Sequence, residues 1–226
     1  MNLIDALANR KSIRGFKPDA VPKEILREIL KAAVNSPSAM NTQPWEMYIV
    51  TGDPLDKIRQ GNIEMLTAGN LPDPDVKIKE KFEHAHKKRQ VDLAIQLFQL
   101  MDITREDQEK KFEWMQRGFR FFDAPTAIIL TYDKILDPAY LSYFDLGCLT
   151  HAICLTALNY NLGTCIHSQG IMYPQVVREH VDIPESKKIF ICISIGYPDW
   201  DFPANKVTSG REPLKDVANW VGFDKF

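Results

Sequence analysis

Two short, continuously apolar runs constrain the fold of this chain more than any other feature. They are PTAIILT at 125–131 and KIFICISI at 188–195. A strand that is apolar at nearly every position is buried on both faces, so helices must cover its sheet from both sides. Helical segments are interleaved with the strands and outnumber them. The sequence therefore predicts a three-layer domain of the α+β or α/β class.

Smaller signals place the remaining elements. The predicted helices span 2–9, 22–36, 52–65, 140–161 and 173–180, and the predicted strands 45–51, 125–131, 164–166 and 188–195. Gly163 is predicted to end the 140–161 helix as a C-terminal glycine cap. Residues 75–122 are charged and helical, in two stretches divided near 102–105, and are a candidate lid. Residues 1–226 are predicted to form a single domain, because a chain of 226 residues can bury one core.

Charge and composition exclude several classes of protein. The chain carries 28 Lys and Arg against 30 Asp and Glu, a net charge of −2, and 45% of its residues are hydrophobic. A disordered chain is excluded, because the apolar content is too high and the net charge too low. Nucleic-acid binding is not expected without a basic excess to neutralise phosphates. The mixed charges of the run at 77–90 are typical of a solvated helix face.

Three features predict a soluble, cytoplasmic protein. Residues 1–14 lack the apolar core and small-residue cleavage site of a secretory signal. The apolar stretch 139–160 contains Asp145, His151 and Asn159, which indicates a buried helix rather than a membrane span. The four cysteines form no CxxC motif and no metal-like cluster, so they are expected to be reduced and structural.

The segment RKSIR at 10–14 is the first candidate site. It places Arg10, Lys11 and Arg14 around Ser12. In an extended conformation, alternation directs Arg10, Ser12 and Arg14 toward one anion. The alternative is a basic cluster at the C-terminus of a helix, where the helix dipole favours positive charge. The spacing alone leaves both interpretations open.

Three further segments contain polar residues that could bind a ligand. PSAMNTQPW at 37–45 offers hydroxyls and amides that suit a planar heterocycle, or plain turn chemistry before a strand. GTCIHSQG at 163–170 contains glycines that let the backbone approach a ligand. The irregular segment 196–223 adds Lys206 and Arg211, or is simply a solvated loop. The chain contains neither GxGxxG nor a Walker motif, so Rossmann and P-loop phosphate binding are not supported.

His167, in the third of these segments, is a candidate general acid. The alternative is a structural role, which is the more common one for a lone histidine. No second His lies near it in the sequence as a metal partner. The sequence predicts no metal site.

Taken in order, these segments resemble one family. The succession RKSIR, PSAMNTQPW, LGTCIHSQG and GYPD…NK…GREPL resembles the FMN-dependent nitroreductases. The SQGIMYPQVVREHVDIPE and GREPLKDVANWVGF segments are most similar to its nitrobenzoate and dinitroaniline reductase branch. The resemblance covers nearly the whole chain, apart from 75–122. It implies an α+β, three-layer α-β-α fold with a mostly antiparallel central sheet, and an intertwined homodimer that binds FMN non-covalently at its interface.

The resemblance also implies a role for each matching residue. By this resemblance, Arg10 and Ser12, with Lys11 between them, bind the FMN phosphate and ribityl chain. Arg14 lies at the pyrimidine edge of the flavin. The residues that line the flavin from the partner subunit are Pro37, Ser38, Asn41 and Gln43. The loop whose backbone faces flavin N5 is Ser168, Gln169 and Gly170. Arg211 matches the C-terminal phosphate-binding arginine, and Lys206 is a less close match.

The implied chemistry needs no catalytic side chain, because the flavin carries the hydride. Reduction places negative charge on the flavin pyrimidine edge, which a fixed cation such as Arg14 stabilises. One site admits NADH or NADPH and then a nitroaromatic or quinone-like small molecule, in two-electron ping-pong turnover. The alternatives are a reductive dehalogenase or flavin-modifying enzyme of the same fold, and a flavin-binding protein without turnover.

Overall fold

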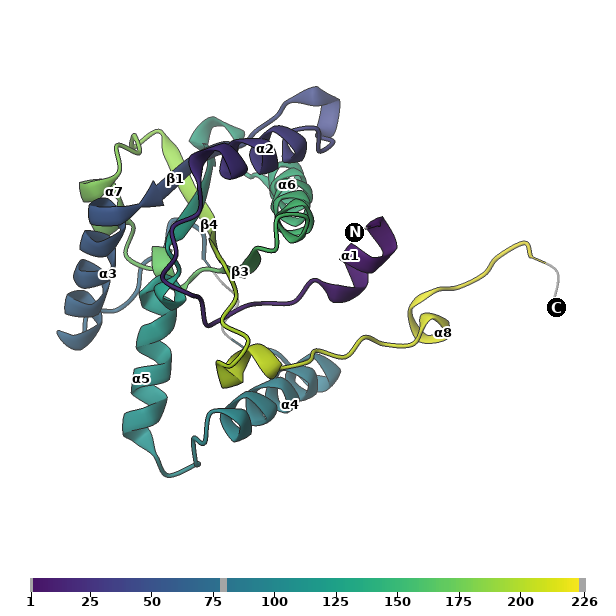
Figure 1. Ribbon diagram of the computed structural model, residues 1–226. Coiled ribbons are helices and arrows are strands. Elements are labelled where there is room, and N and C mark those ends of the chain that lie inside the picture. The colour runs from purple at the N-terminus through teal and green to yellow at the C-terminus, as the bar shows by residue number, and fades with distance from the viewer. Residues whose placement is uncertain (1, 78–80, 224–226) are drawn as a thin grey trace.

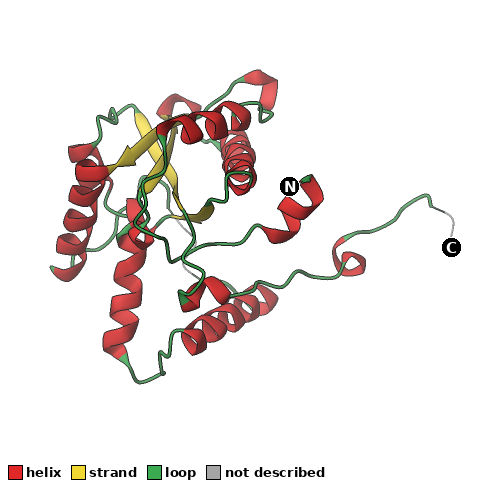
Figure 2. Ribbon diagram, viewed as in Figure 1, coloured by secondary structure: helices red, strands yellow, loops and turns green. Residues whose placement is uncertain are grey.

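The protein folds as helices on both faces of one antiparallel sheet (Figures 1 and 2). The computed structural model describes residues 2–77 and 81–223. The strands are β1 (Glu46–Thr51), β2 (Thr126–Asp133), β3 (Gly163–His167) and β4 (Lys187–Gly196). The α-helices are α1 (Leu3–Asn9), α2 (Lys23–Ala33), α3 (Gly52–Thr67), α4 (His84–Leu100), α5 (Gln108–Phe119), α6 (Tyr140–Leu158), α7 (Pro174–His180) and α8 (Leu214–Val217).

The sheet has the order β1-β2-β4-β3, and all three neighbouring pairs are antiparallel. The central strand β2 pairs with β1 from Thr126 to Thr131 and with β4 along its whole length. The predicted α+β class with an antiparallel sheet is therefore confirmed, and the parallel α/β alternative is excluded for this sheet.

Alternate residues of the central strands supply two separate cores. Ile128 and Leu130 of β2 face α2 and α6, in a cluster with Ile29 and Leu149. Ala127 and Ile129 face α3 and α7, in a second cluster that includes Leu55 and Val177. This two-sided burial is why the strand is apolar at successive positions rather than at every second one.

Helix α6 belongs to the core, as predicted from its polar residues. It is the one helix in the described ranges that is long and apolar enough to cross a membrane, but 44% of that window is buried inside the protein. It ends earlier than predicted. The left-handed residue is Asn161 (φ 57°), with Leu162 N–H bonded to Ala157 O and Asn161 N–H to Leu158 O. This is a Schellman motif with Asn161 in the position predicted for glycine.

Gly163 instead begins β3, where it allows a close approach. A Cβ there would stand 2.5 Å from the Ile13 side chain. The N-terminal segment lies against the free edge of β3 at this point, with a parallel bridge between Ser12 and Thr164. The glycine thus serves the contact between the first candidate site and the sheet.

The 75–122 region is helical over a shorter range than predicted. Helices α4 and α5 are separated near 102–105 as expected, but α4 begins only at His84. Asp75 instead accepts hydrogen bonds from Ile189 N–H (2.8 Å) and the Arg178 guanidinium (2.6 Å). This carboxylate ties the chain to the start of β4, which prevents a helix at 75–77. Residues 78–80, also predicted helical, lie outside the described residues.

Candidate functional site

The RKSIR segment runs extended alongside β3. Ile13 is buried, and its N–H donates to Thr164 O at 2.9 Å. Burial raises the pKa of the neighbouring Cys165 thiol to about 11, against the opposing effects of Arg14, Ser12 and Arg10. The bridge from Ser12 and the bond from Ile13 fit the extended interpretation for this part of the segment, while Arg10 is the C-cap of α1, so the basic cluster also begins at a helix C-terminus.

A cavity of about 330 Å³, here called the cation-lined cavity, lies between residues 7–11 and residues 207–211. It is lined from the N-terminal side by Arg10 and Lys11 and from the C-terminal side by Arg211, with the hydroxyls of Thr208 and Ser209. None of the residues that line it is acidic. Three cations and two hydroxyls without a carboxylate are the donor set that a phosphate group requires.

Lys206 is not among the residues that line this cavity. It lies on the 3-10 turn Pro203–Lys206, before the residues of the C-terminal segment that line the cavity. The structure therefore assembles Arg10, Lys11 and Arg211, and it does not bring the less closely matched Lys206 to the same place.

The loop Ser168–Gly170 continues directly from β3, beyond the point where Arg14 runs beside that strand. Gly170 packs against Phe121 so closely that a Cβ would stand 2.5 Å from its ring. The buried Asn62 amide donates to Gly170 O at 2.9 Å, which anchors the loop from α3. The loop is thus anchored at the end of β3, the strand whose first residues lie beside the RKSIR segment.

His167 is neutral and structural in this arrangement. Its Nε2 lies 2.8 Å from Ser194 Oγ, which in turn donates to Phe121 O at 2.8 Å. The serine proton is thus committed to the carbonyl, so His167 Nε2–H is the donor and the pair cannot act as nucleophile and base. Enclosure of the ring, with a smaller effect from the Arg14 charge, lowers the pKa of His167 to about 3. The histidine is therefore not suited to be a general acid near neutral pH.

This lowered pKa gives a testable pH dependence of stability. Unfolded histidine titrates near 6.5, so between about pH 6.5 and about pH 3 the unfolded chain binds a proton that the folded chain does not. Stability is then lost as the pH falls below about 6.5. His167→Gln, which keeps an N–H donor for Ser194, should show a smaller drop in the urea midpoint between about pH 7.5 and about pH 5. An equal drop in both proteins would contradict the assignment.

The 37–43 loop forms a separate, partly strained turn at the end of α2. Met40, Asn41 and Gln43 all have positive φ angles, from 45° to 59°. Such residues cost about 1 kcal/mol or more each unless their surroundings fix them. The buried Asp145 of α6 does so, because both of its carboxylate oxygens accept from Ala39 N–H at 3.2 Å. None of the described hydrogen bonds connects this loop to the cation-lined cavity.

Asp145 was missed as a site residue by sequence reasoning. Its signal was present, since a carboxylate stands in an apolar helix, but the sequence did not show that its partner was the 37–43 loop. Within the described ranges, no three His, Cys, Asp or Glu side chains gather as a metal site would require. All four cysteines are free thiols, and three of them are buried.

The fold and this site define a class of protein before any comparison is made. An antiparallel α-β-α domain gathers Arg10, Lys11 and Arg211 at one cavity, and the hydrogen bonds of the Ser194–His167 pair are used in the structure. These features are typical of a protein that binds a phosphorylated cofactor and lets the cofactor react.

Comparison with known proteins identifies the family. Residues 7–197 match the Nitroreductase family, and the chain belongs to it. The nitrobenzene nitroreductase of Ectopseudomonas oleovorans is 29% identical over 219 residues, 96% of both chains. The 4-nitrobenzoate reductase of Pseudomonas putida is 27% identical, over 97% of this chain and 95% of its own.

A solved structure gives the same answer for the fold. The FMN- and NADPH-dependent nitroreductase from Sphigopyxis sp. strain HMH matches with a TM-score of 0.93 and 25% identity. The match covers 99% of this chain and all of the other. The predicted nitroreductase-like fold is therefore confirmed over the length of the chain.

Proposed function

We propose that this protein reduces nitroaromatic and quinone-like small molecules with electrons from NADH or NADPH, using bound FMN. The observation that carries the proposal is the cavity shared by Arg10, Lys11 and Arg211, at the start of the segment that continues past β3 to Arg14. Family membership and the nitroaromatic-reducing relatives support the same reaction.

The residues present fit FMN. The cation-lined cavity has the donors for one phosphate, which Arg10, Lys11 and Arg211 would hold, with Ser12 following them along the same segment. FMN, when bound, would supply the hydride transfer that this chain's side chains cannot perform. Arg14 would hold positive charge at the flavin pyrimidine edge, where reduction adds negative charge. The backbone of Ser168, Gln169 and Gly170 would face the other side of the reacting ring.

The 37–43 segment would complete the site from a second subunit. Pro37, Ser38, Asn41 and Gln43 lie in a loop without a described hydrogen bond to the cavity of their own chain. Their hydroxyl and amide groups suit the edge of a planar heterocycle. Helices α4 and α5 would cover the pocket as a lid. A reductive dehalogenase or flavin-modifying activity in the same fold, or flavin binding without turnover, is less well supported by these relatives.

The bound flavin provides the first test. We expect the purified protein to be yellow and to release FMN, because the cation-lined cavity accommodates one phosphate and the chain has no glycine-rich pyrophosphate motif. Chromatography of the flavin released on denaturation identifies it, and FAD as the main species would contradict the proposal. Steady-state NAD(P)H oxidation with a nitroaromatic then separates turnover from mere flavin binding.

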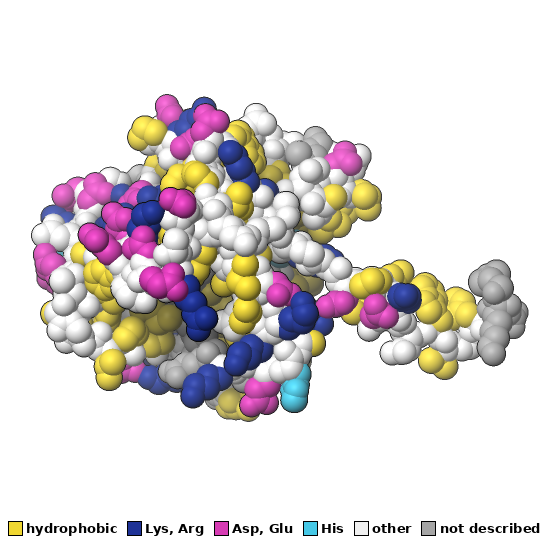
Figure 3. Space-filling model, turned by 90° about the horizontal axis from the view of Figure 1, so that it is seen from below, with side chains coloured by type: hydrophobic (Ala, Val, Ile, Leu, Met, Phe, Trp, Pro, Cys, Tyr) yellow, Lys and Arg dark blue, Asp and Glu magenta, His cyan; other side chains and the backbone are white. Residues whose placement is uncertain are grey.

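We expect a homodimer in solution, in a cytoplasm that keeps the four thiols reduced. After Arg211 the chain leaves the body as an arm with large apolar side chains along it (Figures 1 and 3), including Trp220, which is 65% exposed. Helix α6 has an outward stripe of Tyr140, Phe144 and Gly147, and Phe144 is 69% exposed. Burying each large apolar side chain would contribute about 1.5–3 kcal/mol, and a second copy of the chain can bury them.

Light scattering at micromolar concentration tests the dimer. Phe144→Asp should shift the protein toward monomer. Ile135→Asp, at an exposed position on the 3-10 turn Lys134–Leu136, is the control and should not. A flavin-loaded monomer of the unmodified protein would contradict the expectation.

A further inference from the structure

The backbone around Arg14 is held by side chains from elsewhere in the chain. Arg14 N–H donates to Asn205 Oδ1 at 2.7 Å, and Gly15 N–H donates to the same oxygen at 3.2 Å. In return, Asn205 Nδ2 donates to Gly15 O at 2.7 Å. Arg14, the last residue of the RKSIR segment, and the glycine after it are therefore both bound to one amide.

Asn205 is itself held rigidly. It is 1% exposed, and its second N–H donates to Asp199 O at 2.7 Å. An asparagine side chain can donate two hydrogen bonds and accept two, so this amide is fully satisfied. A buried amide with all its bonds made has one available geometry, which it imposes on the Arg14–Gly15 backbone.

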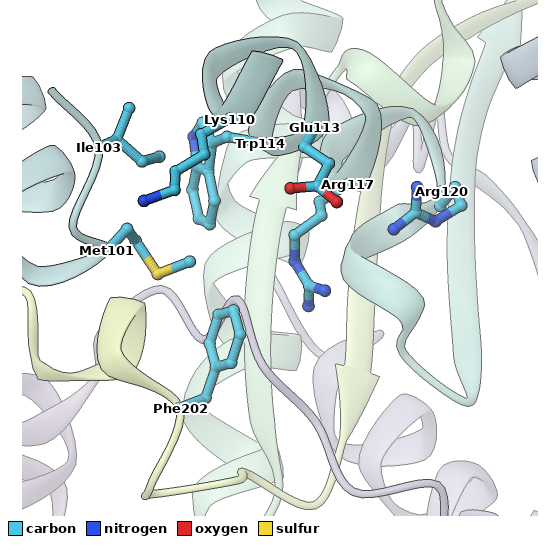
Figure 4. Close-up of a pocket in the computed structure, with 8 residues that line it drawn as sticks. All are labelled: Met101, Ile103, Lys110, Glu113, Trp114, Arg117, Arg120 and Phe202. Carbon is cyan, nitrogen blue, oxygen red and sulfur yellow. The ribbon is translucent and has the colours of Figure 1, made fainter. Parts of the chain in front are cut away.

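The carbonyl of Arg14 is held from the opposite direction. Arg117, at the end of α5, donates from Nη2 to Arg14 O at 3.2 Å and pairs through Nη1 with Asp123 at 3.1 Å. Its guanidinium lies 4.5 Å from the centroid of the Phe202 ring. Figure 4 shows both side chains at a cavity of about 220 Å³ beneath α5. Arg14 is thus fixed at its N–H by one residue and at its C=O by another.

Gly15 leaves room for this arrangement. A Cβ on Gly15 would lie 2.3 Å from the Phe202 ring, so only glycine fits beneath it. Phe202 and Asn205 belong to the same short C-terminal stretch, whose residues Thr208, Ser209 and Arg211 line the cation-lined cavity. The C-terminal stretch therefore contacts the Arg14 backbone and supplies phosphate-binding groups at once.

We infer that Asn205 and Arg117 are positioning residues that hold the Arg14 cation where the reduced flavin needs it. The inference rests on the proposed function, because Asn205 and Arg117 can affect the flavin in this way only if Arg14 faces it. A long arginine side chain keeps a fixed charge position only when its own backbone is fixed. A shift of about 1 Å in a catalytic group can cost up to about a hundredfold in rate.

A double-mutant cycle tests this role apart from general stability. The proteins are Asn205→Ala, Arg14→Ala and the double variant, and the readouts are the midpoint potential of bound FMN and the FMN dissociation constant. Asn205→Ala should weaken the preference for reduced over oxidised flavin by about tenfold, which is about 30 mV for a two-electron couple. In the Arg14→Ala background the same change should have no further effect on the potential.

Two further variants keep the test decisive. Arg117→Met keeps an unbranched side chain of similar length and removes the guanidinium that bonds to Arg14 O, so it should lower the potential in the same direction. Ile153→Val, a buried change in α6, loosens the core without touching Arg14 and should leave the potential unchanged. If Asn205→Ala lowers the potential equally with and without Arg14, or does not lower it at all, the inference is overturned.

Amide hydrogen exchange in the flavin-free protein examines the contacts directly. Removing bonds worth about 0.5–1.5 kcal/mol each should speed exchange at Arg14 and Gly15 by up to about tenfold in Asn205→Ala. Unchanged exchange would overturn the inference even if FMN binds normally. A protein that binds no FMN would instead overturn the proposed function, and this role of Asn205 and Arg117 with it.

Discussion

Replacing Arg14 by alanine should slow reduction of the bound flavin by nicotinamide by about one to two decades, with FMN binding little changed. The loss of a charge-assisted contact costs about 1.5–3 kcal/mol, and each 1.36 kcal/mol is a factor of ten in rate. The cost falls on the reduced state, because negative charge appears at the pyrimidine edge only on reduction. Interactions that strengthen during the reaction change the rate rather than the ground-state affinity.

Rapid-reaction measurement of the reductive half-reaction, normalised to bound flavin, gives this rate. Arg14→Lys keeps the charge and the backbone contacts to Asn205 and Arg117, so it should recover a large part of the loss. If Arg14→Ala, reconstituted with excess FMN, is reduced as fast as the unmodified protein, the role assigned to this cation is wrong.

Replacing Arg211 by alanine should have the opposite pattern. We expect the FMN dissociation constant to rise by about tenfold or more, with an unchanged reduction rate for the flavin that remains bound. The phosphate carries the same charge before and after reduction, so its contact contributes uniform binding. Arg211 is exposed, and among the residues that the structure describes its guanidinium donates to Ser209 and Gly210 alone, close neighbours that it can leave to turn toward a phosphate.

Fluorescence titration of the flavin-free protein measures this affinity. The difference in FMN affinity between Arg211→Ala and the unmodified protein should become smaller at high salt, because mobile ions screen an exposed cation. Lys206→Ala removes a nearby cation that does not line the cavity, so its effect on FMN affinity should be smaller. If Lys206→Ala weakens binding more than Arg211→Ala, the phosphate lies elsewhere.

The strands and most helices were predictable because their signals are local. The apolar runs that became β2 and β4 need only neighbouring residues to identify a strand buried on both faces. Helix boundaries were less well predicted where a distant partner decided them. Asp75 was counted in a helix, but its carboxylate is used by Ile189 and Arg178.

The residue types of the candidate site could be predicted from the sequence, but the contacts between its segments could be predicted only in part. Alternation within RKSIR predicts that Arg10, Ser12 and Arg14 share one side, and the structure shows this segment extended beside β3 at Ser12. The same segment's contact with Arg211 depends on residues about two hundred positions apart meeting at one cavity. From the sequence, His167 was a candidate general acid. Its structural role became evident only from its burial and its hydrogen bond with Ser194.

The sequence by itself therefore determined the three layers, because they follow from the periodicity of the apolar residues. The antiparallel sheet and the cations expected at a phosphate were predicted from the resemblance of four short segments to one family. Only the tertiary structure decided how those cations are held. Asn205 lies 190 residues beyond Gly15, and Asp145 lies 106 residues beyond Ala39. A hydrogen bond between such distant residues has no periodic signature in the chain. It forms because the packed sheet and helices bring a buried amide or carboxylate to backbone groups that need a partner.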